Sequence, residues 1–190
     1  MPPCAAVMRH RDGVWVFGYG SLVWRPAFAF AERRSAHIEG WARRFWQAST
    51  DHRGVPGAPG RVVTLVASAG ARCDGTAYRI APGDVDEVLA ALDHREKGGY
   101  RRHVVPLALA LPDEVVEAGL VYVASEDNPN YVGPAPLEEI AAHVLGAHGP
   151  SGPNDEYVFE LAAALRAMGA EDRHVFAVAE RVRAQASAAD

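Results

Sequence analysis

Glu96 is the residue whose place in the sequence best suits it to chemistry. Val85, Val88, Leu89 and Leu92 precede it at i, i+3, i+4 and i+7, the spacing of a helix with one apolar face. One more turn of that face reaches Glu96, at the helix end and just before two glycines. Burial of a carboxylate raises its pKa toward neutrality, where the group can serve as a general base. A surface glutamate on a frayed helix end is the alternative interpretation.

A glycine-rich turn near the N-terminus is the second candidate. Residues 14–17 form an apolar run that is predicted to be a strand, and residues 18–22 follow it as Gly-Tyr-Gly-Ser-Leu. Glycine permits positive φ, so consecutive N–H groups of such a turn can bind an anion or a carbonyl oxygen. Because Val23 occupies the position that needs glycine, the turn is neither a dinucleotide fingerprint nor a nucleophile elbow. A plain strand-to-turn connection is the alternative.

The elements that must position these residues are strands in the first two thirds of the chain and helices in the last third. This segregation favours an α+β fold over a doubly wound parallel sheet. The predicted strands are residues 14–17, 38–49, 61–68, 76–80, 103–111 and 120–124, the predicted loops are 51–60 and 127–136, and the predicted helices are 85–95, 137–145, 155–168 and 172–186.

Composition narrows the function. The chain has 190 residues, 49% of them hydrophobic, which suits one domain over residues 14–190, preceded by a flexible leader at 1–13. The net charge of -5 gives no support to binding of nucleic acid or an anionic membrane, and no apolar run is long enough to span a bilayer. Cys4 and Cys73 form no CxxC motif, and the scattered histidines show no metal-ligand spacing. We therefore expect a cytoplasmic protein without a metal.

A series of short motifs runs in order through the chain. It includes Val-Phe-Gly-Tyr-Gly-Ser-Leu-Val-Trp at residues 16–24, Arg-Phe-Trp-Gln at 44–47 and Leu-Asp-His-Arg-Glu-Lys-Gly-Gly-Tyr at 92–100. Further motifs occupy residues 49–54, 59–65, 128–134, 149–154 and 156–157. With these motifs the chain resembles the ChaC family of γ-glutamylcyclotransferases over roughly residues 14–180.

The resemblance implies a small mixed β-barrel flanked by helices, and an enzyme that cleaves glutathione to 5-oxoproline and cysteinylglycine. It implies a carbon–nitrogen lyase without metal or organic cofactor and without an obligate protein partner. Glu96 takes the place of the family's catalytic carboxylate. The substrate-binding turn corresponds to Val16, Phe17, Gly18, Tyr19, Gly20 and Ser21, and we expect Leu22 to contribute its amide.

Two further residues are candidates for substrate binding. Arg53 borders the loop at 51–60, where its guanidinium would match the glycyl carboxylate of glutathione, and Arg61 is an alternative for the same role. Tyr131, in the proline-bounded loop at 127–136, is expected to bring a hydroxyl to the substrate. A solvated arginine and a packed tyrosine are the corresponding alternatives. Two other functions stay open: a cyclotransferase for other γ-glutamyl amines or dipeptides, and a non-catalytic domain that binds γ-glutamyl ligands.

Overall fold

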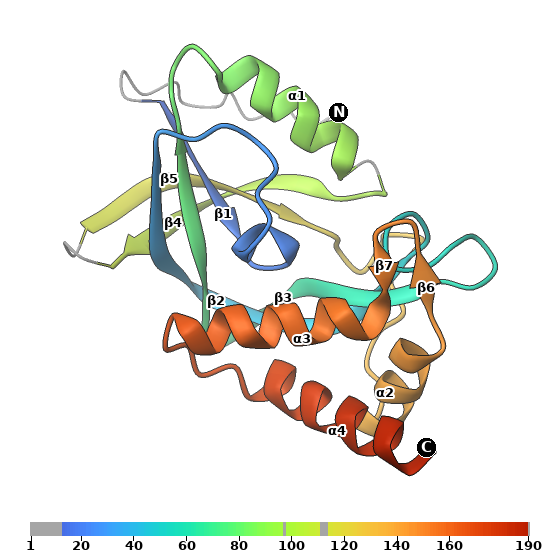
Figure 1. Ribbon diagram of the computed structural model, residues 1–190. Helices are drawn as coiled ribbons and strands as arrows, with labels where there is room; N and C mark the ends of the chain where they lie inside the picture. The colour runs from blue at the N-terminus through green and yellow to red at the C-terminus, as the bar shows by residue number, and fades with distance from the viewer. Residues whose placement is uncertain (1–12, 97, 111–113, 190) are drawn as a thin grey trace.

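The computed structural model describes residues 13–96, 98–110 and 114–189 (Figure 1). The predicted leader, except Gly13, lies outside these ranges. The strands are β1 (Val14–Gly18), β2 (Glu32–Ser49), β3 (Gly60–Ile80), β4 (Arg101–Leu109), β5 (Glu114–Val123), β6 (His148–Gly149) and β7 (Gly152–Pro153); the helices are η1 (Ser21–Val23, a 3₁₀ turn), α1 (Val85–Arg95), α2 (Leu137–Leu145), α3 (Asn154–Ala167) and α4 (Arg173–Ala189).

Five strands close into a barrel in the order β1-β3-β2-β4-β5. Four of the pairings are antiparallel, and β1 meets β5 in parallel at Val16 and Leu120. The barrel is therefore mixed, as predicted, and most of the helical residues follow it in the chain. The predicted α+β class is confirmed.

The predicted strands at 61–68 and 76–80 are one continuous strand, β3, and β2 begins six residues before the predicted start at 38. Residues 69–75 look like a turn because they contain two glycines. Residues 72–75 pair instead with the first part of β2, with Ile38 opposite Cys73 and Ala36 opposite Gly75. This long-range pairing overrides local propensity. A register shift at Gly40, whose φ is +80°, lets the two long strands bend.

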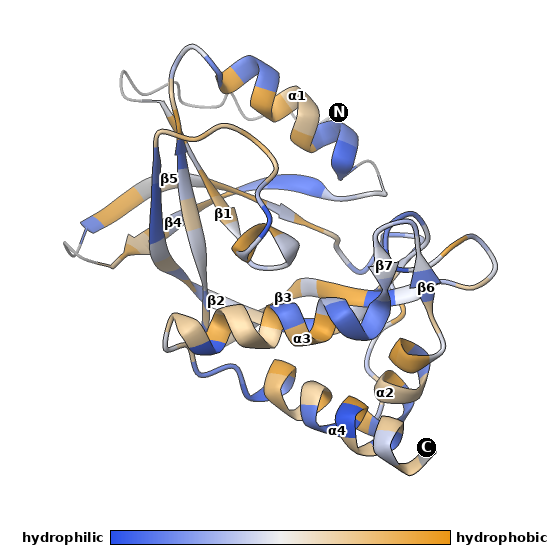
Figure 2. Cartoon of the chain, viewed as in Figure 1, coloured by the Kyte–Doolittle hydropathy of each residue, from blue (hydrophilic) through white to orange (hydrophobic). Residues whose placement is uncertain are grey.

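Two apolar cores lie on opposite faces of β1. Val16 packs with Val88, Leu89 and Leu92 of α1, whereas the next residue, Phe17, packs in the core shared with α2, α3 and α4. Successive strand residues point to opposite faces, which explains the division. Figure 1 shows α1 on one side of the barrel and α3 beside α4 on the other. Figure 2 shows hydrophilic and hydrophobic residues alternating along α1. Within the described residues, no helix is both long and apolar enough to cross a membrane.

Candidate active site

Glu96 caps the C-terminal end of α1, as the periodicity predicts. The buried face of α1 consists of Val85, Val88, Leu89 and Leu92. The N–H of Glu96 donates to the carbonyl oxygen of Leu92 at 2.8 Å, and its own carbonyl accepts from the N–H of Tyr100 at 3.2 Å. Its backbone is therefore held on both sides of the double-glycine break.

The carboxyl group of Glu96 is mostly shielded from water, with its side chain 18% exposed. Burial raises its pKa to about 7; the guanidinium of Arg95 opposes this shift, and the carboxylate of Asp51 adds to it. Nε of Arg95 lies 3.7 Å from Oε1 of Glu96. At neutral pH the carboxyl can thus both accept and return a proton, which is what a general acid–base catalyst requires.

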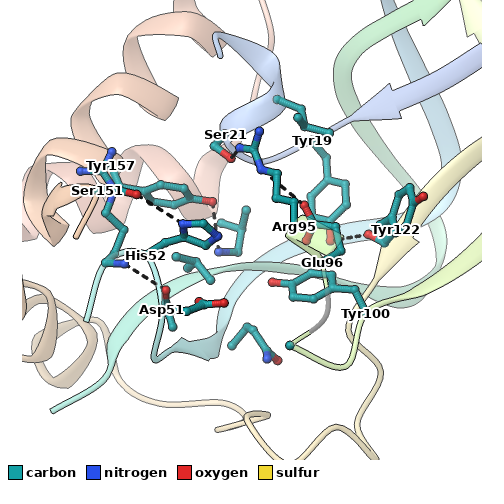
Figure 3. A pocket seen from close by; sticks show the side chains of 18 of the residues that line it. Tyr19, Ser21, Asp51, His52, Arg95, Glu96, Tyr100, Tyr122, Ser151 and Tyr157 are labelled. Carbon is teal, nitrogen blue, oxygen red and sulfur yellow. Dashed lines mark hydrogen bonds and ion pairs between the residues drawn. The ribbon is translucent and has the colours of Figure 1, made fainter. Parts of the chain in front are cut away.

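A cavity of about 320 Å³ opens beside Glu96 (Figure 3). Its walls come from segments that are distant in sequence, among them the turn after β1, the end of β2 and the loop after it, the start of β3, the end of α1 and the first turn of α3. Of the predicted binding turn, Phe17, Tyr19, Gly20, Ser21 and Leu22 line the cavity, and so do Arg53 and Glu96.

The turn after β1 forms a single 3₁₀ turn in which Val23 donates to the carbonyl of Gly20 at 2.9 Å. Within the described residues, the amides of Gly20, Ser21 and Leu22 have no hydrogen-bond acceptor. Unpaired N–H groups at the start of a helical turn are suited to bind oxygen atoms of a ligand.

Three predicted binding residues do not line the cavity. Val16 is fully buried against α1. Gly18 lies beneath the turn, where an added Cβ would come 2.5 Å from the Cβ of Leu22. Tyr131 pairs by backbone with Gln47, and its ring lies beside Gly133. Val16 and Gly18 therefore support the turn from outside the cavity, and a substrate contact by Tyr131 stays a prediction.

The two loop arginines are buried, contrary to a solvated role. Arg53 donates to the carbonyl of Pro153 at 2.9 Å and to Oε1 of Glu156 at 3.3 Å. Arg61 does not line the cavity; it donates to the carbonyl of Phe45 at 2.9 Å. Arg53 lines the cavity with a guanidinium that already has a carboxylate partner, and its binding of a substrate carboxylate stays a prediction.

Four tyrosines line the cavity that contains Glu96: Tyr19, Tyr100, Tyr122 and Tyr157. Of these, only Tyr19 was predicted from the sequence to bind the substrate. Tyr19 donates from its hydroxyl to the carbonyl of Tyr122 at 2.8 Å. Burial raises the pKa of Tyr157 to about 12 and that of Tyr100 well above its ordinary value, with the charge of Glu96 adding to both. These hydroxyls stay protonated at neutral pH and can donate hydrogen bonds. Tyr157 belongs to the short motif at 156–157, but no helical or turn pattern predicts its place in the cavity, because the tertiary fold brings α3 there.

Comparison with known proteins places the chain. The model of the family described as ChaC-like protein matches residues 14–185. The chain belongs to the ChaC-like family. A human relative, glutathione-specific gamma-glutamylcyclotransferase 1, is 44% identical over an alignment of 168 residues that covers 85% of this chain and 75% of the relative. Gamma-glutamylcyclotransferase 2-3 of Arabidopsis thaliana is 46% identical, over 80% of this chain and 79% of the relative.

A solved structure shares the fold over most of the chain. The crystal structure of the yeast gamma-glutamyl cyclotransferase specific to glutathione, labelled with selenomethionine, superposes with a TM-score of 0.84. It is 33% identical and covers 90% of this chain and 96% of its own. The predicted membership of the ChaC-like family and the predicted fold are confirmed. Among the described residues, no His, Cys, Asp and Glu side chains gather as a metal-binding group.

Proposed function

We propose that this ChaC-like protein is a glutathione-specific γ-glutamylcyclotransferase, a carbon–nitrogen lyase that converts glutathione to 5-oxoproline and cysteinylglycine. The observation that carries the proposal is the carboxyl of Glu96, with a pKa of about 7, in the wall of a cavity that is also lined by a turn with unpaired amides. The names of the human and yeast relatives support glutathione as the substrate.

The substrate supplies its own nucleophile. The α-amine of the γ-glutamyl group attacks the γ-carbonyl carbon, a five-membered lactam forms, and the bond to the cysteinyl nitrogen breaks. The α-ammonium loses two protons in becoming the lactam N–H, and the leaving nitrogen gains two in becoming an ammonium group. No water is consumed, and the protein needs only to move protons and hold the two reacting groups together.

Glu96 is proposed to move the protons. In its ionised form the carboxylate takes a proton from the α-ammonium, and in its protonated form it gives one to the leaving nitrogen. General acid–base catalysis of this kind contributes roughly 10²–10⁴-fold. Free amides in the turn after β1 would bind the oxyanion that develops on the γ-carbonyl, where one donor is worth about 3 kcal/mol.

Replacement of Glu96 by Gln tests the proposal, because it removes the ionisable group while keeping the size of the side chain. We expect release of 5-oxoproline to fall by about 10³-fold, with glutathione binding and the folded state retained. Near-normal turnover by this variant would refute the assignment of Glu96. Failure of the wild-type protein to release 5-oxoproline would refute the function and favour a non-catalytic γ-glutamyl-binding domain.

Comparison of glutathione with γ-glutamyl-alanine tests the second candidate, a cyclotransferase for other γ-glutamyl amines or dipeptides. Equal kcat/KM values for the two would favour it. We also propose a cytoplasmic location and a small-molecule substrate without a nucleic acid, membrane or obligate protein partner. The net charge of -5 supports the absence of a nucleic acid or an anionic membrane as partner, and two cysteines without a disulfide framework fit a reducing compartment.

A further inference from the structure

Arg95 stands directly beside the carboxyl group that is proposed to accept the substrate's proton. Nη2 of Arg95 donates to Oγ of Ser21 at 2.7 Å, Nη1 donates to the carbonyl of Pro26 at 3.4 Å, and Nε lies 3.7 Å from Oε1 of Glu96. The side chain lines the cavity and is 24% exposed. The guanidinium therefore links the end of α1 to the turn after β1, and part of it faces the ligand space (Figure 3).

The two hydrogen bonds leave most of this guanidinium unused. A guanidinium has five N–H donors in a planar fork that fits a carboxylate. The hydroxyl of Ser21 accepts from Arg95, so its own proton remains free to donate to a ligand. Arg95 and Ser21 together thus present a cation and a hydroxyl donor at one point of the cavity wall.

A γ-glutamyl group requires a binding site for its α-carboxylate close to the residue that binds its α-ammonium. Its α-ammonium and α-carboxylate are attached to the same carbon, so they lie within a few ångströms of each other in any bound pose. Once the ammonium faces Glu96, the carboxylate must lie beside Glu96 as well. A cation within 4 Å of Oε1 meets this requirement, and Arg95 supplies it.

The other arginines of the cavity wall fit this role less well. Arg53 is held by the carbonyl of Pro153 and by Glu156. Arg25 is exposed to solvent and forms no ion pair with Glu96 in the described part of the chain. Only Arg95, of these three, lies against the carboxyl group of Glu96.

We propose that Arg95, with the hydroxyl of Ser21, binds the α-carboxylate of the γ-glutamyl group and thereby selects a zwitterionic amino-acid end. The inference rests on the proposed function and deepens it. It leaves the amides of the turn after β1 for the γ-carbonyl oxygen. It also gives the donor half of the substrate its own recognition, separate from that of the cysteinylglycine half.

The test compares glutathione with 4-aminobutyryl-cysteinylglycine, which keeps the amine and the γ-carbonyl but has hydrogen in place of the α-carboxylate. We expect the wild-type kcat/KM to be about 100-fold higher for glutathione, the size of a lost charged hydrogen-bond pair. Measured on the alkaline plateau, where Glu96 is ionised in both proteins, Arg95→Gln should reduce kcat/KM for glutathione by about as much and change that for the analogue less than about threefold. An equal fall on both substrates would overturn the proposal, because it would show that Arg95 only fastens the turn.

Two further variants distinguish the charge of Arg95 from its hydrogen bond to the turn after β1. Ser21→Ala removes the contact between turn and helix but keeps the guanidinium, so most of the preference for the α-carboxylate should survive. Arg25→Gln removes another arginine of the cavity wall, and the preference should again survive. Loss of the preference in Arg25→Gln, with retention in Arg95→Gln, would transfer the role to Arg25 and overturn the proposal.

Calorimetric titration of the Glu96→Gln protein distinguishes failure of this inference from failure of the proposed function. Binding there requires no turnover, and glutathione should bind more tightly than the analogue. Adding Arg95→Gln should abolish that difference. If the wild-type protein released no 5-oxoproline but the difference depended on Arg95, the function would be wrong and the inference would stand. A difference that persists without Arg95 would overturn the inference alone.

Discussion

Nδ2 of Asn128 donates a hydrogen bond of 3.0 Å to the carbonyl oxygen of Gly98, two residues after Glu96. Oδ1 of Asn128 accepts from Nε2 of Gln47 at 3.2 Å and from the N–H of Asn130 at 2.8 Å. A buried asparagine thus joins β2 and the loop at 127–136 to the double-glycine break. Gly99 is needed there, because its φ is +94° and an added Cβ would lie 2.4 Å from Nδ2 of Asn128.

Asn128→Asp should impair turnover without touching the substrate. The change keeps both acceptor contacts but places a carboxylate oxygen against the Gly98 carbonyl, so the chain after Glu96 must shift. A small misplacement of a catalytic group can reduce kcat by about 10- to 100-fold. Steady-state kinetics should show the loss in kcat more than in KM. Glu126→Gln, an exposed change two residues earlier in the chain, is the control. A normal kcat in a less stable Asn128→Asp protein would contradict this prediction.

The pH dependence of turnover should report the raised pKa of Glu96. The free enzyme must hold this carboxylate ionised to accept a proton, so kcat/KM should rise with pH and reach half of its plateau near pH 7. Profiles with glutathione, measured at constant ionic strength, test this. Residual activity of Glu96→Gln should lack this limb. A wild-type limb near the ordinary glutamate pKa of 4.5 would show that the carboxyl is solvated when it works.

Stability should depend on pH for the same reason. The pKa of Glu96 is higher in the folded state than in the unfolded state, so the folded state binds more protons between pH 4.5 and about 7. The contribution of this group to stability is present below that window and is lost as pH rises through it. Glu96→Gln should therefore be more stable than wild type at pH 8, by roughly 3 kcal/mol at most.

Denaturant unfolding of both proteins at pH 4.5 and pH 8 measures this difference. The advantage of the Gln variant should shrink toward the lower pH, because the wild-type carboxyl is then protonated in the folded state. An advantage that does not change with pH would mean that Glu96 ionises equally in both states.

Gly18→Ala should displace the turn after β1. The new Cβ would lie 2.5 Å from Cβ and 3.1 Å from the carbonyl carbon of Leu22, so the 3₁₀ turn must move. We expect kcat/KM to fall by about 100-fold, since misplaced donors stabilise charge poorly. Gly83→Ala is the matched control, because a Cβ there meets no atom within 4 Å. Far-UV circular dichroism checks that the barrel persists, and unchanged kinetics would show that the turn adapts.

Local patterns predicted the two segments that carry most of the proposed chemistry. Helical spacing from Val85 to Leu92 predicted the placement of Glu96, and glycine spacing predicted the turn after β1. Both signals arise from backbone geometry over a few residues. The cavity wall from Tyr157 had no such signal, because it depends on how the helical core packs against the barrel. The continuity of β3 through residues 69–75 was missed for a related reason, since it comes from pairing with β2.

Leu22, at the end of the binding turn, lies in the same apolar core as Leu89 and Leu92 of α1. One apolar cluster, which includes Leu22, Leu89 and Leu92, therefore supports both the N–H donors of the turn and the helix end that carries Glu96. Substitutions in this apolar cluster would change the catalytic rate for every γ-glutamyl substrate alike. Substitutions at the solvent-exposed edge of the cavity would instead change the preference among substrates. An engineer who wants the enzyme to accept a new leaving group should mutate the exposed edge of the cavity first and keep this cluster intact.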